Sequence, residues 1–301
     1  SEIEGEILNY DQVRSSIARK LGIEYAGMVS SDRNVDSVVE MMLDATQNYR
    51  QPLDEERLFG WHAALFPTGR SGMHKIDVAC YRSGEMQVVS GAMGKEKVHY
   101  QAPAPESVKS EMDEFLKWFN AENELDPVLK SGIAHFRFII IHPFDDGNGR
   151  IARALSDMLL TRSDDTPQRF YSLSSQILTE RKMYYEVLQK TQFSDGDITE
   201  WLVWYLNCLY RALQSTETTF QKVLNKIEFW NKHQGTEFNA RQRLMLNKLF
   251  DGFEGKLTSS KWAKITKSSQ NTAIRDIQDL MEKGILQKEP QGGRSTNYEL
   301  C

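Results

Sequence analysis

The sequence predicts a mainly α-helical protein with one glycine-rich β-hairpin and a small second domain near its C-terminal end. Over residues 1–230, apolar side chains recur at the three- and four-residue spacing of a helix face. Between Gly69 and Gln101 the pattern changes, because glycines separate short β-prone pieces such as IDVACYR and MQVVSG. With 301 residues and 40% hydrophobic content, the chain can bury one large core and a smaller one.

The helices follow from this periodicity in chain order. Residues 7–21 form the first, and Gly22 is a suitable C-terminal stop. The segment 133–141 is apolar nearly all round, which is typical of a buried helix. Further helices are predicted over 35–48, 54–66, 108–119, 151–162, 179–191 and 197–231.

Composition argues against several classes of protein. The apolar run at the centre, Phe138–Ile141, is far shorter than the roughly 20 residues of a membrane span. The first residues are acidic, whereas a secretory signal begins with a basic stretch. Cys80, Cys208 and Cys301 are widely spaced and odd in number, so neither disulfides nor structural zinc are expected. We expect a cytoplasmic chain without a membrane segment and, because Ser1 stands where Met would, a trimmed N-terminus.

From Asn239 onward, the sequence predicts three short helices and a two-stranded wing. The helices correspond to RQRLMLNKLF, LTSSKWAKITK and SSQNTAIRDIQDLMEKGIL, and the segment GGRSTNYEL completes the wing. This order resembles a winged helix-turn-helix domain. We therefore expect domain boundaries that give an N-terminal region over 1–30, a main domain over 31–236 and a winged-helix domain over 237–301.

DNA binding by this last domain is an open alternative. Lys and Arg number 11 against 8 Asp and Glu over residues 237–301, which is only mildly basic. Base contacts would come from the exposed start of the second helix, at Ser268, Ser269 and Asn271. Against this, three acidic residues of the same helix would repel phosphates, namely Asp276, Asp279 and Glu282. The competing role is packing on the main domain or on a partner.

The segment HPFDDGNGR, residues 142–150, concentrates chemically active residues in one loop before a helix. Its glycines permit positive φ and close backbone approach, so amide groups at the helix start can point at phosphate oxygens. Arg150, and Arg153 one turn later, add forked donors for the same oxygens. The carboxylate of Asp146 would repel phosphate unless a cation intervenes, which predicts magnesium. His142 can accept a proton at neutral pH.

Two widespread nucleotide-binding motifs fit this loop less well. GNGRIA fits the dinucleotide pattern GxGxxG/A, but no acidic residue follows at about 20 positions, where the sequence reads TPQRFYSLS. No GxxxxGK[ST] motif is present, so a Walker-type NTPase is not supported. Each residue of the loop alone could have a purely structural role, with the glycines as turn formers and Pro143 as a helix terminator. Together they favour phosphoryl-type transfer.

HPFDDGNGR resembles the signature HPFx[DE]GN[GK]R of Fic domain proteins, without departures. The resemblance implies the Fic/Fido helical fold, in which His142 deprotonates a protein hydroxyl that attacks the α-phosphate of ATP and releases pyrophosphate. Asp146 would hold Mg²⁺, and Phe144 would anchor the loop in the core. The residues implied in ATP binding are Gly147, Asn148, Gly149, Arg150 and Arg153, with Tyr184 and Tyr185 as adenine contacts. For either tyrosine, packing in the core is an equal alternative.

The resemblance also covers the segment from Trp61 to Tyr100, which is similar to the family's flap. That flap aligns a target peptide by strand pairing, a mode with loose side-chain demands. The candidate docking residues are Met86, Gln87, Val88, Val89 and Ser90.

Glu4 and Gly5 match the end of an inhibitory motif, [ST]xxxE[GN], found on a regulatory helix of some Fic proteins. The Ser or Thr of that motif would precede Ser1. A carboxylate beside Arg153 would form an ion pair and occupy the place of the γ-phosphate. The alternative is a solvated Glu in a first helical turn.

Three functions are therefore considered. The first is an autoinhibited protein adenylyltransferase that modifies a Ser, Thr or Tyr hydroxyl, including its own. The second is a phosphodiesterase that removes AMP from proteins, with Glu4 orienting the attacking water. The third is a transcriptional regulator whose Fic portion only senses nucleotide. Family habit makes a homodimer reasonable.

Overall fold

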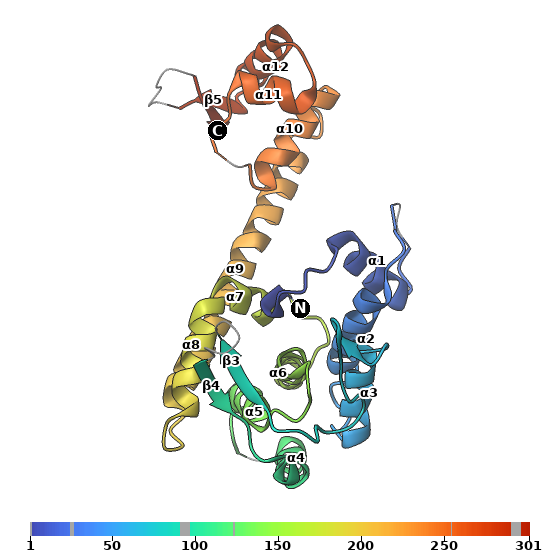
Figure 1. Cartoon of the computed structure of the whole chain (residues 1–301). Coiled ribbons are helices and arrows are strands. Elements are labelled where there is room, and N and C mark those ends of the chain that lie inside the picture. The colour runs from blue at the N-terminus through green and yellow to red at the C-terminus, as the bar shows by residue number, and fades with distance from the viewer. Residues whose placement is uncertain (1, 25–26, 91–96, 123, 254, 290–295) are drawn as a thin grey trace. The chain divides into compact units, whose positions relative to one another are not determined.

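The computed structural model describes residues 2–24, 27–90, 97–122, 124–253, 255–289 and 296–301. The chain forms two compact units, Ser1–Leu213 and Gln214–Cys301. The division falls inside the long helix α9 (Thr199–Lys232), whereas the sequence places the boundary after residue 236, beyond the end of that helix. The prediction of a mainly helical protein is confirmed (Figure 1).

Unit 1 contains most of the helices. In chain order its helices are η1 (Glu2–Glu4, a 3-10 turn), α1 (Tyr10–Lys20), α2 (Arg33–Gln47), α3 (Glu55–Leu65), α4 (Pro105–Asn120), α5 (Pro127–Ile141), α6 (Asn148–Asp164), α7 (Leu173–Thr179), α8 (Arg181–Gln192) and the first part of α9. Most lie where the periodicity predicts a helix, but several boundaries differ.

The first predicted helix is shorter than expected. It begins at Tyr10 because the Asn9 side chain accepts a hydrogen bond from the backbone N–H of Gln12 and caps the helix there. Before it, η1 is followed by Gly5, whose φ of +86° reverses the chain. Glu4 therefore lies in a 3-10 turn rather than in the regulatory α-helix that the resemblance implies.

Helix α5 is longer than expected, because polar and small residues in its first half interrupt the apolar pattern. Lys130 is buried with its ammonium group donating to the Ala121 carbonyl oxygen at 2.7 Å. A Cβ atom at Gly132 would lie 2.9 Å from the Tyr205 ring, so the small residue lets α9 approach closely. Tertiary packing, not periodicity, sets this part of the helix.

Helices α5 and α6 lie at the centre of unit 1 with the other helices around them (Figure 1). Every residue of α6 from Asn148 to Thr161 is buried except Gly149. At the far end of α6, Arg162 donates through Nε to the Tyr49 carbonyl oxygen at 2.6 Å and through Nη2 to that of Gln51 at 2.9 Å. Helix α6 is thus fixed to the connection between α2 and α3.

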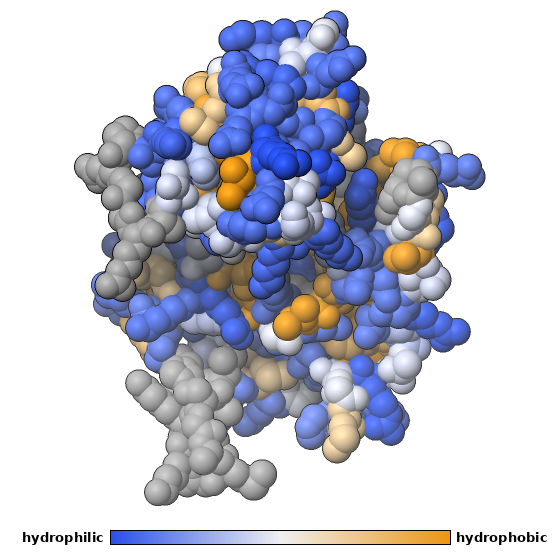
Figure 2. All heavy atoms as spheres, turned by 90° about the horizontal axis from the view of Figure 1, so that it is seen from above, coloured by the Kyte–Doolittle hydropathy of each residue, from blue (hydrophilic) through white to orange (hydrophobic). Residues whose placement is uncertain are grey.

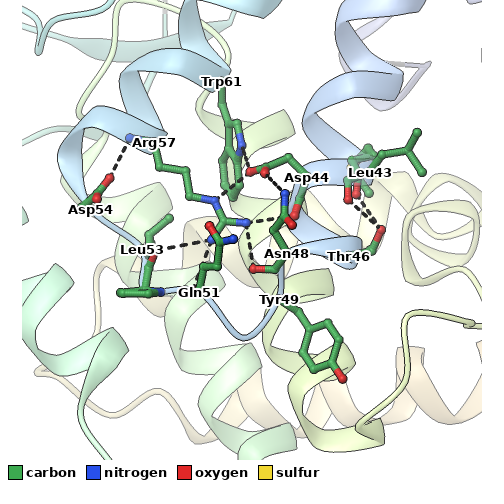
Figure 3. Close-up of polar contacts among 12 residues, drawn as sticks. Leu43, Asp44, Thr46, Asn48, Tyr49, Gln51, Leu53, Asp54, Arg57 and Trp61 are labelled. Carbon is green, nitrogen blue, oxygen red and sulfur yellow. Dashed lines mark hydrogen bonds and ion pairs between the residues drawn. The ribbon is translucent and has the colours of Figure 1, made fainter. Parts of the chain in front are cut away.

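A polar cluster ties α2 to α3 (Figure 3). The Asp44 Oδ2 atom accepts hydrogen bonds from Arg57 Nε and from Trp61 Nε1, both at 2.7 Å. Arg57 also donates to backbone carbonyl oxygens of the intervening turn, including that of Asn48 at 3.2 Å. Because the Arg57 guanidinium is charged and mostly buried, these bonds stabilise the α2–α3 connection. That connection is also the segment to which Arg162 of α6 is bonded.

The predicted single hairpin is two small antiparallel sheets. The first pairs β1 (Arg70–Ser71) with β2 (His74–Lys75), and the second pairs β3 (Gln87–Ser90) with β4 (Lys97–Gln101) across an irregularity between Val88 and Val89. The β-prone segment IDVACYR, residues 76–82, forms no strand, because its backbone bonds mainly to His62 and the signature loop instead.

Unit 2 contains the end of α9, then α10 (Ala240–Phe250), α11 (Ser259–Thr266), α12 (Gln270–Glu282), β5 (Leu286–Lys288) and β6 (Tyr298–Leu300). The two strands pair antiparallel. Trp262 is fully buried at the centre of a separate core. Three helices followed by a two-stranded sheet is the order of elements that the sequence predicts.

Hydrophilic side chains cover most of the face in Figure 2, and the apolar ones form small, separated patches. Among the described residues, no helix has the length and apolar character needed to cross a bilayer.

Candidate functional site

The signature loop connects α5 to α6 between two residues of positive φ. His142 caps α5 with a φ of 49°, and Gly147 precedes α6 with a φ of 85°. Between them, Phe144 is fully buried. Asn148 Nδ2 donates to the Phe144 carbonyl oxygen at 2.8 Å, and the Phe144 N–H donates to Asn148 Oδ1 at 3.0 Å. Both polar atoms of the Asn148 side chain therefore brace the loop.

The orientation of His142 suits a general base. Its Nδ1 atom lies 3.2 Å from the Ile139 carbonyl oxygen, which can only accept, so Nδ1 carries the proton. Nε2 then presents a lone pair. Burial lowers the pKa of His142, which keeps the imidazole neutral at pH 7.

A cavity of about 700 Å³ opens beside this loop, within the range of small-molecule sites. It brings together residues of four elements and the loop: Glu4, Tyr100, His142, Asp146, Gly149 and Tyr185. The start of α6 borders it, where the first backbone N–H groups of a helix have no intrahelical acceptor and the dipole favours an anion. The cavity therefore combines a proton acceptor with an anion-binding helix end.

Asp146 is held in one orientation. Its Oδ1 atom accepts from the Gly147 N–H at 2.5 Å, and its Oδ2 atom accepts from the Ser71 hydroxyl. Arg150 Nη2 lies 3.7 Å from the same Oδ2. Among the described residues, no group of three or more His, Cys, Asp or Glu side chains could hold a metal ion unaided. A magnesium ion here would need oxygen ligands from phosphate, as is usual for this cation.

The N-terminal segment places one carboxylate against Arg150 of the signature and another against Arg153, one turn later in α6. Arg153 Nη1 and Nη2 donate to the two Glu4 carboxylate oxygens at 2.5 and 2.8 Å. Burial would raise the pKa of Glu4, but the hydrogen bonds and charge of Arg153 outweigh it and hold that pKa below its usual range. Arg150 Nη1 donates to Glu6 Oε2 at 3.1 Å. The sequence analysis expected the ion pair between Glu4 and Arg153, but not the one between Glu6 and Arg150.

Gly149 is the residue that lets Glu4 come this close. A Cβ atom at that position would lie 2.7 Å from Glu4 Oε1 and 3.4 Å from Arg153 Nη1. The Glu4 carboxylate therefore lies against the first turn of α6, at the end of the helix that favours anions.

Sequence reasoning also missed Arg82, which is 3% exposed. Its Nε donates to the His142 carbonyl oxygen at 2.8 Å, its Nη1 to that of Gly84 at 2.9 Å, and its Nη2 to that of Pro103 at 2.6 Å. Its backbone N–H donates to the Pro143 carbonyl oxygen at 2.8 Å. One buried guanidinium thus links the signature loop to the segments on both sides of the β3–β4 hairpin.

His62 is a second residue that was missed. It is fully buried and its ring stacks on Phe144 at 4.2 Å between centroids. The Ala79 N–H donates to His62 Nδ1 at 3.2 Å, so Nε2 carries the proton and donates to the Asp146 carbonyl oxygen, also at 3.2 Å. Burial lowers the pKa of His62 to about 4, so the neutral form supports the loop.

The two predicted adenine contacts differ in setting. Tyr184 is buried among aromatic residues, and its hydroxyl lies 3.0 Å from His135 Nε2. Tyr185 is 45% exposed. Both contribute to the wall of the cavity, so packing in the core does not remove Tyr184 from the surface that a ligand would meet.

The predicted docking residues lie at the β3–β4 hairpin. The Met86 carbonyl oxygen accepts from the Ala102 N–H at 3.0 Å, and Gln87 begins β3. For residues 88–90 the backbone belongs to β3, while their side chains lie outside the described part. The Tyr100 hydroxyl donates to the Ile140 carbonyl oxygen at 2.5 Å, which fixes β4 to the end of α5, two residues before His142.

Fold and site together define a helical domain that presents a His and the N-terminal end of a helix to a cavity of small-molecule size. Residues 52–160 match the model of the Fic/DOC family. Residues 1–23 match a family described only as a domain of unknown function, DUF4172.

Similar curated proteins bear one name. A "Protein adenylyltransferase Fic" of Culex quinquefasciatus is 28% identical over 215 residues, which are 70% of this chain and 39% of that protein. A protein of the same name from Nematostella vectensis is 30% identical over 146 residues, 47% of this chain and 30% of that protein. The chain thus spans well under half the length of these relatives.

Solved structures share the fold. A Fic family protein from Desulfovibrio desulfuricans G20 superposes with a TM-score of 0.53 and 22% identity, covering 100% of this chain and 83% of that one. A Fic domain containing signaling protein from Bacteroides thetaiotaomicron VPI-5482 also gives 0.53, with 23% identity, 72% of this chain and 81% of that one.

Proposed function

We propose that this chain transfers AMP from ATP to a hydroxyl group of a protein, and that its N-terminal segment inhibits the transfer. The observation that carries the proposal is that His142, with Nε2 free to accept a proton, and the N-terminal end of α6 border the same cavity. The Fic/DOC match and the name of the curated relatives support the same reaction.

In this reaction His142 Nε2 takes the proton of the target hydroxyl, and the hydroxyl oxygen forms a bond to the α-phosphorus of ATP. The bond from that phosphorus to the oxygen that bridges to the β-phosphate breaks, and pyrophosphate leaves with the electron pair. The backbone N–H groups of the first turn of α6 and the Arg150 guanidinium would stabilise the charge on the phosphate oxygens. A neutral imidazole is needed at the start, which the lowered pKa of His142 provides.

Asp146 would hold the magnesium ion that accompanies ATP. The fit rests on the carboxylate chemistry: both oxygens are oriented by hydrogen-bond donors at the edge of the cavity. A hard oxygen ligand of this kind suits Mg²⁺, which would screen phosphate charge.

The target would pair with β3, whose sheet has two strands only among the described residues. Main-chain pairing at such an edge holds an extended peptide with little demand on its side chains. The hairpin is fixed near His142 by Tyr100, so a hydroxyl-bearing side chain there would be brought toward the cavity.

Inhibition would come from the ion pair between Glu4 and Arg153. A phosphate group and the Glu4 carboxylate both need the fork of Arg153, and the two anions repel one another at close range. ATP could then bind productively only after Glu4 leaves. The ion pair also disfavours Glu4 as the base for AMP removal, because Arg153 occupies both carboxylate oxygens and lowers the pKa of Glu4.

The test uses ATP labelled on its α-phosphate with magnesium, and measures label retained on protein. Glu4→Gly should label itself or a lysate protein strongly, and Glu4→Gly/His142→Ala should not. Glu2→Gly is the matched control, since it makes the same substitution in the same 3-10 turn, two residues from the Arg153 partner. If Glu4→Gly stays blank while it still binds ATP, AMP transfer is wrong. If Glu2→Gly is equally active, the carboxylate of Glu4 is not the inhibitor.

A further inference from the structure

Two acidic side chains of α12 are hydrogen-bonded within unit 2. Asp276 is 5% exposed and accepts hydrogen bonds from Arg241 Nε at 2.7 Å and from Asn239 Nδ2 at 2.9 Å. Asp279 Oδ2 accepts from Gln242 Nε2 and from Lys283 Nζ, both at 2.6 Å. These partners belong to α10, to its N-cap and to the C-cap of α12. Two of the three carboxylates on α12 are therefore paired within unit 2.

The face of α12 that points away from the core of unit 2 is polar and carries Arg275. Ala273, Ile277 and Leu280 are buried in the core of unit 2. Asn271, Arg275 and Gln278 are exposed and follow one another at spacings of four and three residues, which places them on one stripe of the helix.

Two lysines precede this stripe. Lys264 is exposed on α11, and Lys267 is exposed in the turn between α11 and α12. In the part of the chain that the structure describes, neither these lysines nor Arg275 have an ion-pair partner. The exposed carboxylate of Glu282 lies seven residues after Arg275, about 10 Å farther along the helix. The first turns of α12 therefore present Arg275 on the exposed stripe. The carboxylate one turn farther on, that of Asp279, is 45% exposed but paired with Lys283 and hydrogen-bonded by Gln242.

We infer that unit 2 binds double-stranded DNA, with the exposed face of the first turns of α12 in the major groove. The groove is about 12 Å wide and admits a helix, and Arg, Asn and Gln are side chains that make bidentate hydrogen bonds to base edges. Lys264 and Lys267 would meet phosphates on the flank. The repulsion expected from the sequence is reduced, because Asp276 is buried against Arg241 and the Asp279 carboxylate is paired with Lys283.

The test measures fluorescence anisotropy of a labelled duplex of about 20 base pairs with the full chain. Two lysines in contact with phosphates predict binding about 12-fold weaker at about 200 mM salt than at about 50 mM. Arg275→Glu should weaken binding at least tenfold. Lys248→Glu, on the exposed side of α10, also replaces a cation with a carboxylate and should alter binding less than about twofold.

Asn271→Ala removes no charge and should weaken binding with an unchanged salt dependence, while circular dichroism checks that each variant is folded. No binding at low salt would overturn the inference. So would equal loss in the two charge-reversal variants, or equal affinity for a single strand of the same length.

Discussion

Replacing Arg82 with Met should impair the site without changing any atom that meets substrate. Its guanidinium donates to the carbonyl oxygens of His142, Gly84 and Pro103, and the residue is almost fully buried. Met keeps most of the apolar stem and removes all three donors. The His142 carbonyl then loses the contact that helps fix the left-handed backbone of this residue.

The size of the effect follows from those three bonds. A hydrogen bond to a charged group contributes about 1.5–3 kcal/mol, and a buried carbonyl left without a donor costs about 1–3 kcal/mol. Burial of the guanidinium, which lowers the pKa of Arg82, offsets part of the gain in the folded protein. We therefore expect Arg82→Met to lower the free energy of unfolding by about 3 kcal/mol.

Urea unfolding and labelling by α-labelled ATP together check this prediction. In the Glu4→Gly background, Arg82→Met should lower kcat about tenfold and leave the KM for ATP nearly unchanged, because the anion-binding end of α6 is intact. Arg82→Lys should have a stability and a kcat between those of the parent protein and those of Arg82→Met. Arg50→Met is the control, since its ion pair with Asp165 is exposed and should leave both measurements unchanged. Stability and kcat equal to those of the parent protein would refute the reasoning.

Three further predictions address the loop and its cover. Glu6→Gln should raise self-labelling about threefold, less than Glu4→Gly, because a partly exposed ion pair with Arg150 is released; an unchanged rate would contradict this. Ser71→Ala should raise the magnesium concentration for half-maximal labelling about tenfold, and an unaltered titration would argue against Ser71 as the residue that orients the metal-binding carboxylate. His62, with a pKa of about 4 in the folded state and about 6.5 when unfolded, gains its proton mainly on unfolding. Stability should therefore fall by up to about 3 kcal/mol as pH drops from about 6.5 to about 4, and less in His62→Gln when urea midpoints are compared.

The sequence by itself determined the helices and the chemistry of the signature loop. Both depend on residues that are close in the sequence. Helical periodicity is a pattern of neighbouring residues, and His142, Asp146 and Arg150 lie within one turn-forming segment of nine residues. Apolar spacing alone does not fix the helix boundaries. Asn9 capping α1 and the buried Lys130 in α5 are decided by contacts that apolar spacing does not encode.

Only the tertiary structure decided what surrounds that loop. Glu6 reaches Arg150 from 144 residues away in the chain, and Arg82 meets His142 across 60 residues. Nothing in a single sequence marks such pairs, because a Glu in an N-terminal turn or an Arg in a glycine-rich segment is usually solvated. The face of α12 was decided in the same way: the linear sequence predicts that Asp276 repels DNA, yet its carboxylate is turned toward Arg241. Charged residues can be counted from the sequence, but packing decides which way their side chains face.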